Sequence, residues 1–181
     1  MPHIDLANDL PGIVGLMAFR PETAGPLNAL AEALLRAEST LTRGEREAIA
    51  AYVSSLNECQ FCERSHSAFA ARQLDGGYDV VDAIKRNPGE APVSPRLRTL
   101  LEIAGSVQRS GREVTGDQVA AARAAGASDV EIHDAVLIAA AFCMYNRYVD
   151  GLATWAPDGR DAYDHMAEGI VERGYGASLP T

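Results

Sequence analysis

The chain has 181 residues, a formal net charge of −9 and a sequence pI of about 4.9. Its sixteen basic residues form no basic stripe, which argues against a nucleic-acid partner, and no apolar run approaches the roughly 20 residues that span a bilayer. Three cysteines are too few for a secreted disulfide scaffold, so a close pair of them is typical of catalysis or metal binding.

Alanine and leucine dominate a hydrophobic fraction of 47%, and no segment alternates as a strand does, so the sequence predicts an all-α fold. Residues 1–20 are expected to be irregular, with Pro11-Gly12 as a turn signal. Capping boxes begin at Thr42, Thr115 and Ser128, and Ser94-Pro95 is a further helix start. The expected helices cover residues 21–38, 42–56, 57–74, 78–86, 95–109, 115–126, 128–150 and 160–173.

The clearest linker is the Pro- and Gly-rich stretch 87–95, which separates a first half, residues 21–87, from a second half, residues 95–174. We expect both halves to form one domain over residues 1–181. A weak internal repeat relates them at a spacing of 84 residues. It pairs Glu47, Cys59, Cys62 and His66 with Glu131, Cys143, Asn146 and Asp150.

The most informative motif is Cys59-Gln60-Phe61-Cys62 followed by His66. At about 100° per residue, the two thiols and the imidazole share one sector of a helix. With Asn57 as N-cap, both cysteines lie near the helix start, where free backbone amides and the helix dipole stabilise a thiolate. The pattern predicts reversible thiol redox chemistry with His66 as proton carrier, and either cysteine could be the attacking thiolate.

Glu47 is the expected fourth member of the site, although it lies twelve residues before Cys59. A break in the helix near Asn57 would fold the chain back and bring this carboxylate to the imidazole, which it would orient. Three other carboxylates compete for the role. Glu45 is more simply a capping residue, and Glu58 and Glu63 are more simply solvated charges.

These residues resemble the alkylhydroperoxidase D-like (AhpD-like) and carboxymuconolactone decarboxylase family, and within it the peroxidase-related group. The resemblance is carried by Leu41-Thr42-Arg43-Gly44-Glu45-Arg46-Glu47 followed by Cys59-x-x-Cys62-x-x-x-His66. The later stretches 131–136 and 142–151 are similar to the group's second signature. The similarity covers roughly residues 10–170.

The resemblance implies an AhpD-like helical fold and a homo-oligomer, commonly a trimer or hexamer. It further implies an antioxidant peroxidase with a redox-active disulfide, in which Cys62 attacks the hydroperoxide and Cys59 resolves the sulfenic acid. His66 would then shuttle protons and Glu47 would orient it. The reductant would be a dithiol, such as a lipoyl or thioredoxin-like donor, and no cofactor or metal is implied. Phe61 replaces a polar residue that some members carry between the cysteines.

Three alternatives stay open. A decarboxylase or lactone-processing enzyme on the same fold would not require two thiols. A zinc-stabilised helical oligomer would need a fourth ligand from distant Cys143, His133 or Glu47. An inert, buried cysteine pair would have no chemistry.

Several other residues are given structural roles. Cys143 is expected in the core, and His133 is expected to cap or pair near a helix start. Arg147 and Asp150 are spaced as a helical ion pair. The N-terminus lacks the basic start and apolar block of a signal peptide, so a cytoplasmic location is expected.

Overall fold

The computed structural model describes residues 1–178, which form helices and no strands. The α-helices are α1 (Gly12–Phe19), α2 (Pro21–Arg36), α3 (Arg43–Leu56), α4 (Gln60–Ala71), α5 (Gly77–Arg86), α6 (Pro95–Arg109), α7 (Gly116–Ala124), α8 (Asp129–Gly151) and α9 (Asp161–Arg173). Two short 3₁₀ turns, η1 (Gly111–Glu113) and η2 (Tyr175–Ser178), complete the described chain. None of the described helices is long and apolar enough to cross a membrane.

The predicted helix starts are confirmed where local capping decides them. Thr42, Thr115 and Ser128 each form a complete capping box, and Ser94 accepts the backbone N–H of Leu97. The expectation of an irregular N-terminus is wrong for residues 12–19, which form α1. This helix is held by burial of Leu16 and its neighbours rather than by a side-chain cap.

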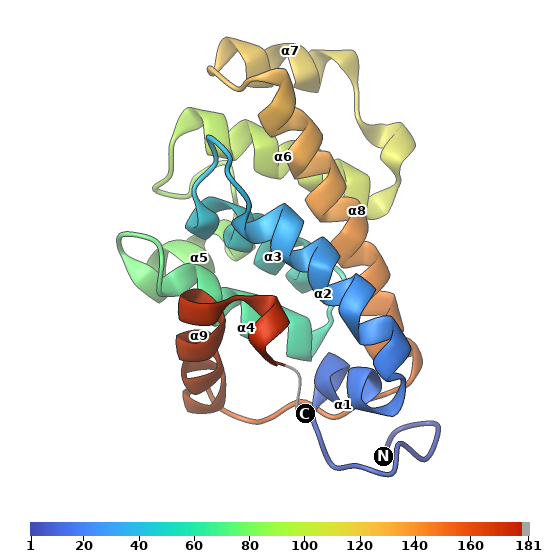
Figure 1. Ribbon diagram of the computed structural model, residues 1–181. Coiled ribbons are helices and arrows are strands. Elements are labelled where there is room, and N and C mark those ends of the chain that lie inside the picture. Colours follow the sequence, from blue (N-terminus) through green and yellow to red (C-terminus); the bar gives the residue numbers. More distant parts are fainter. Residues whose placement is uncertain (179–181) are drawn as a thin grey trace.

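Helix α3 lies at the centre of the fold. Every residue from 46 to 54 is buried, and α3 packs against α4, α8, α6 and α5. Figure 1 shows α4 beneath α3, with α9, drawn in dark red, lying against α4. The turn η2 packs against α2 and α9, and its Tyr175 ring contacts His66 and Phe69 of α4. The C-terminal end of the chain therefore returns to the helix that carries the cysteine motif.

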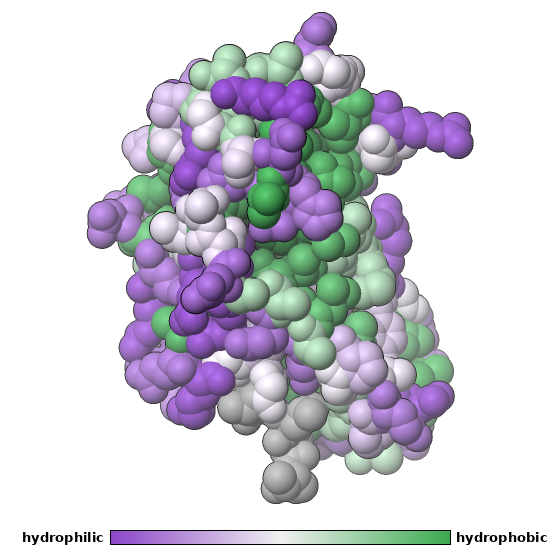
Figure 2. All heavy atoms as spheres, turned by 45° about the horizontal axis from the view of Figure 1, so that its top comes forward, coloured by the Kyte–Doolittle hydropathy of each residue, from purple (hydrophilic) through white to green (hydrophobic). Residues whose placement is uncertain are grey.

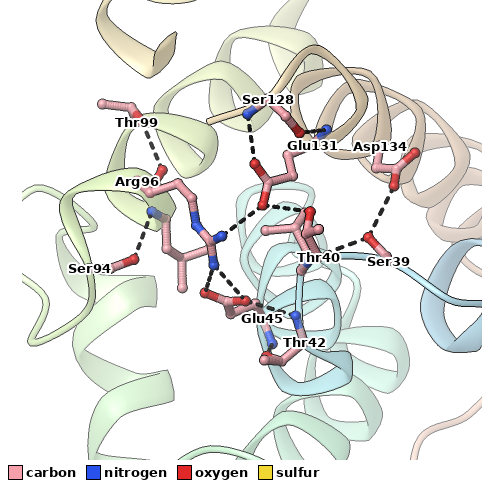
Figure 3. Close-up of polar contacts among 12 residues, drawn as sticks. Ser39, Thr40, Thr42, Glu45, Ser94, Arg96, Thr99, Ser128, Glu131 and Asp134 are labelled. Atoms are coloured by element: carbon pink, nitrogen blue, oxygen red, sulfur yellow. Dashed lines mark hydrogen bonds and ion pairs between the residues drawn. The ribbon is translucent and has the colours of Figure 1, made fainter. Parts of the chain in front are cut away.

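An arginine joins two capping boxes across this core. Arg96 at the start of α6 donates to Oε1 of Glu131 at 2.7 Å and to Oε1 of Glu45 at 3.0 Å. Thr40 donates to the same oxygen of Glu131 at 2.9 Å. Figure 3 shows the three side chains converging from α3, α6 and α8. The network ties the first turns of these three helices together.

The internal repeat in the sequence does not correspond to a repeated site. Glu47 and His66 lie on two helices that fold back on one another, whereas Glu131 and Asp150 lie near opposite ends of the single helix α8. At 1.5 Å per residue, nineteen residues of helix separate the latter pair by about 28 Å. Only the first set of residues can meet.

Candidate active site

A tight turn between α3 and α4 positions the cysteines. Asn57 closes α3, Glu58 adopts a left-handed conformation with φ 57°, and Cys59 caps α4 with its N–H bonded to the Ser54 carbonyl at 3.1 Å. The predicted break near Asn57 is therefore present. The expectation that Asn57 is the N-cap is wrong, since Cys59 occupies that position and α4 begins at Gln60.

Asn57 instead anchors the turn through side chains from distant helices. Its amide donates to Oδ1 of Asn146 at 2.8 Å, and its carbonyl oxygen accepts from Gln108 at 2.9 Å. Asn146 in turn donates to the Ser54 hydroxyl at 3.1 Å. These partners lie 51 and 89 residues away in sequence, so local capping statistics could not identify them. The network fixes the turn from which Cys59 and Cys62 project.

The two thiols lie one helical turn apart, both are buried, and no disulfide joins them. Cys62 lies in the first turn of α4, whose backbone amides have no partners within the helix. A hydrogen bond to Cys62, followed by burial, raises the pKa of the Cys59 thiol far above its usual range, and a hydrogen bond to Asp150 acts in the same direction. Cys59 therefore stays protonated beside Cys62.

Glu47 and His66 are brought together as predicted. Oε2 of Glu47 lies 2.6 Å from Nδ1 of His66, and the carboxylate is almost fully buried. An ionised carboxylate accepts the Nδ1–H of the imidazole, which leaves Nε2 as the basic nitrogen. In the described part of the chain, Nε2 has no hydrogen-bond partner, so it is available to a thiol or substrate.

Tyr175 is a member of this group that the sequence did not indicate. Its hydroxyl donates to Oε1 of Glu47 at 2.6 Å, so the carboxylate is held on both oxygens. Burial, and then the Glu47 charge, raise the pKa of Tyr175 well above its usual value, which keeps the phenol a donor. Tyr175 lies in η2 between two glycines, 128 residues from Glu47, and no pattern in the chain marks it.

Aromatic rings enclose the imidazole. Phe142 and Phe69 meet His66 edge-on at centroid distances of 4.5 and 5.1 Å, and Tyr175 stacks at 6.3 Å. The side chains of His66 and Glu47 are 12% and 3% exposed, and their electrostatic interaction is stronger at such partly buried positions than in bulk water.

The competing carboxylates are engaged elsewhere. Glu45 completes the Thr42 capping box, which confirms its predicted capping role. It also forms an ion pair with Arg96. Glu63 is not simply solvated, because it pairs with Lys85 and accepts from Ser67. Glu58 lies at the left-handed turn position. Glu47 is thus the carboxylate that reaches His66.

The remaining predicted residues have structural surroundings. Cys143 is buried next to Asn57, and exposed His133 pairs with Asp134 at 3.0 Å. Arg147 donates to the Cys143 carbonyl, and no ion pair joins it to Asp150 in the described chain, contrary to the spacing argument.

The zinc alternative depends on a set of ligands that the fold does not assemble. Among residues 1–178, no three His, Cys, Asp or Glu side chains are placed to hold one metal ion.

Comparisons with known proteins agree with this geometry. The sequence model of the carboxymuconolactone decarboxylase family matches residues 21–85, which include all four predicted site residues. An "alkylhydroperoxidase AhpD core: uncharacterized peroxidase-related protein" from Ralstonia eutropha JMP134 is 28% identical, with a TM-score of 0.77, over 87% of this chain and 81% of that chain. An "uncharacterized peroxidase-related protein" from Silicibacter sp. TM1040 is 30% identical, with a TM-score of 0.75, over 85% and 78% of the respective chains. No curated protein matches the chain significantly.

Proposed function

The chain belongs to the AhpD-like and carboxymuconolactone decarboxylase family, and from this premise we propose that it is a thiol-dependent peroxidase that reduces hydroperoxides. The observation that carries the proposal is the placement of two free thiols one turn apart at the start of α4, with an imidazole held by a buried carboxylate one turn beyond Cys62. Both solved relatives are described as peroxidase-related, which supports the same reaction class.

The first step is attack by the Cys62 thiolate on the distal oxygen of the hydroperoxide. Nε2 of His66 accepts the thiol proton beforehand, and Glu47 stabilises the resulting imidazolium. The O–O bond breaks as the S–O bond forms, so Cys62 becomes a sulfenic acid and the alkoxide leaves. His66 returns its proton to this alkoxide, which departs as an alcohol.

The second step closes a disulfide. The Cys59 sulfur attacks the Cys62 sulfenic acid, and the hydroxyl group leaves with the Cys59 proton as water. The raised pKa of Cys59 supports this order, since a thiol that stays protonated competes poorly with Cys62 for the peroxide. An external dithiol, such as a lipoyl or thioredoxin-like donor, then reduces the disulfide by two exchange steps.

We also propose that the protein acts in the cytoplasm as a homo-oligomer, a trimer or hexamer. Helix α8 exposes Val130, Leu137 and Met144 to solvent in the single chain. Figure 2 shows a band of hydrophobic side chains bordered by hydrophilic ones. Contiguous apolar surface of this kind is typical of an interface. Sedimentation equilibrium should give a mass of three or six times 19.2 kDa. Leu137→Asp should lower the measured mass toward that of the monomer.

Thiol counting tests the peroxidase proposal directly. One equivalent of a hydroperoxide should remove two of the three thiols per chain, and a dithiol should restore both. Retention of all three thiols at millimolar peroxide would contradict the proposal.

The family name supports a second candidate, a decarboxylase or lactone-processing enzyme. Activity on a carboxylated lactone that survives Cys59→Ser would favour it over the peroxidase, because that reaction needs no disulfide.

A further inference from the structure

A cavity of about 430 Å³ lies beside His66, between α4 and α9, with α1 on a third side. Phe61 and Phe69 of α4 and Ile170 of α9 contribute apolar wall. The lining stretches of α4 and α9, residues 61–69 and 165–173, each extend over nine residues, whose end residues lie about 12 Å apart along the helix. A volume of this size and an apolar lining are typical of a small-molecule site.

One buried polar group at the cavity wall has no protein partner. Ser65 lines the cavity and is 3% exposed, and its hydroxyl makes no hydrogen bond within the described chain. A serine inside a helix ordinarily bonds to the carbonyl four residues earlier, and a buried hydroxyl without a partner is unfavourable. A bound oxygen atom would satisfy it. Because Ser65 and His66 lie three and four residues after Cys62, both are one turn from the attacking sulfur.

The charges around the cavity favour an anion. No Asp or Glu side chain lines it, although the whole chain carries a net charge of −9. One cationic side chain, Arg173, lies at its edge with an exposed side-chain fraction of 65%, whereas the neighbouring His165 lies 3.8 Å from the carboxylate of Glu168. The carboxylate nearest to Arg173 is that of Glu172 at 4.0 Å, which is a weak contact between two exposed groups.

Building on the peroxidase activity proposed above, we propose that this cavity binds organic hydroperoxides that have an apolar body and a carboxylate, such as a fatty-acid hydroperoxide. The apolar chain lies between α4 and α9, and the carboxylate binds Arg173 at the edge. The Ser65 hydroxyl donates to the oxygen that becomes the alkoxide when Cys62 breaks the O–O bond. His66 supplies the proton, and the hydroxy acid leaves.

Filling the cavity tests its role. Gly169 lines it, and a Cβ there would meet only the flexible end of Arg173, so Gly169→Leu should narrow the cavity without breaking α9. In Gly169→Leu, the ratio of kcat/KM for linoleic acid hydroperoxide to kcat/KM for hydrogen peroxide should be at least tenfold lower than in the wild-type protein. The matched control is Gly25→Leu, a helical glycine with open space around it, which should leave the ratio unchanged.

Removing the charge tests recognition of the carboxylate. The wild-type protein should prefer linoleic acid hydroperoxide over its methyl ester by about fivefold in kcat/KM, which is what an exposed ion pair supplies. Arg173→Gln should abolish this preference, whereas Arg112→Gln, a change in exposed η1, should preserve it.

Ser65→Ala should lower kcat for both organic substrates more than Ser67→Ala does.

A binding measurement separates this inference from the peroxidase proposal. Calorimetric titration with the unreactive hydroxy acid should detect binding to the wild-type protein and its loss in Gly169→Leu. If hydroperoxides are reduced but neither the kcat/KM ratios nor the titration respond to Gly169→Leu, the cavity is not the substrate site and the inference is overturned. If no hydroperoxide oxidises a dithiol, the peroxidase proposal fails, and with it the substrate assignment. Saturable binding of the hydroxy acid would then still support a site for carboxylated apolar ligands.

Discussion

The hydroxyl of Tyr175 lies 2.6 Å from Oε1 of Glu47, and the other oxygen of the same carboxylate lies 2.6 Å from the imidazole of His66. The last described turn of the chain thus completes a line of hydrogen bonds that begins at the phenol and ends at the ring that faces the cavity between α4 and α9. Tyr175 therefore fixes the position of the carboxylate that orients His66.

Tyr175→Phe should therefore slow peroxide reduction. Without the phenol, Glu47 keeps only its contact with His66, so the imidazole is held less firmly beside Cys62. At pH 7 a roughly tenfold loss of kcat is expected, since a hydrogen bond to a charged group is worth about 1.5–3 kcal/mol. The measurement is the rate of hydroperoxide-dependent dithiol oxidation.

The matched control is Tyr145→Phe, which removes a buried phenol that donates to the Leu27 carbonyl rather than to a carboxylate. It should reduce stability by about 1 kcal/mol and leave kcat unchanged. An equal loss of kcat in both variants would assign the effect to packing and not to the contact with Glu47.

Replacing each of the three cysteines by serine should have a different effect on activity. Cys62→Ser should abolish turnover, and Cys143→Ser should retain it, because Cys143 packs against Asn57 away from the proposed cycle. Cys59→Ser should oxidise once and stop at a sulfenic acid on Cys62, which dimedone traps for mass spectrometry. Normal turnover by the Cys62→Ser protein would refute the assignment of Cys62 as the attacking thiol.

The parts of this site that are local in sequence could be predicted, and the parts that depend on distant partners could not. The capping box at Thr42 and the break near Asn57 follow from residue types within a few positions, and they bring Glu47 to His66. The cap at Cys59 was missed because Asn57 finds better partners in Asn146 and Gln108. Tyr175 was missed because its place is set by packing against α2 and by ring contacts with His66 and Phe69 of α4, and no periodic pattern marks it.

Alkaline pH should destabilise the fold through its buried tyrosines. Burial raises the pKa of Tyr145 to about 12, and burial followed by Glu47 raises that of Tyr175 well above its usual value. A phenol with a raised folded-state pKa contributes stability that is complete below about pH 10, the unfolded value, and is lost as pH rises further. The urea midpoint should fall between pH 9 and pH 11, and by less in Tyr175→Phe. An identical fall in that variant would exclude Tyr175 as a contributor.

The Arg96 network predicts how strongly the two halves of the chain depend on each other. Glu131 is 2% exposed, and although burial opposes its ionisation, hydrogen bonds from Ser128 and Thr40 together with the Arg96 charge lower its pKa overall. Arg96→Met leaves this carboxylate without its cation, so stability at pH 7 should fall by about 2–3 kcal/mol. The surface pair of Arg109 with Glu113 provides the control, and Arg109→Met should cost no more than about 1 kcal/mol.

The same network makes the effect of Arg96→Met dependent on pH. A carboxylate with a lowered folded-state pKa contributes stability above its unfolded pKa of about 4.5, and loses it as pH falls. The difference between wild type and Arg96→Met in urea unfolding should therefore shrink between pH 7 and pH 3.5. If the chain is one domain, as we propose, both proteins should unfold in a single transition seen alike by circular dichroism and by Trp155 fluorescence. Two transitions, with only the second half destabilised by Arg96→Met, would instead mean that residues 21–87 and 95–174 fold separately.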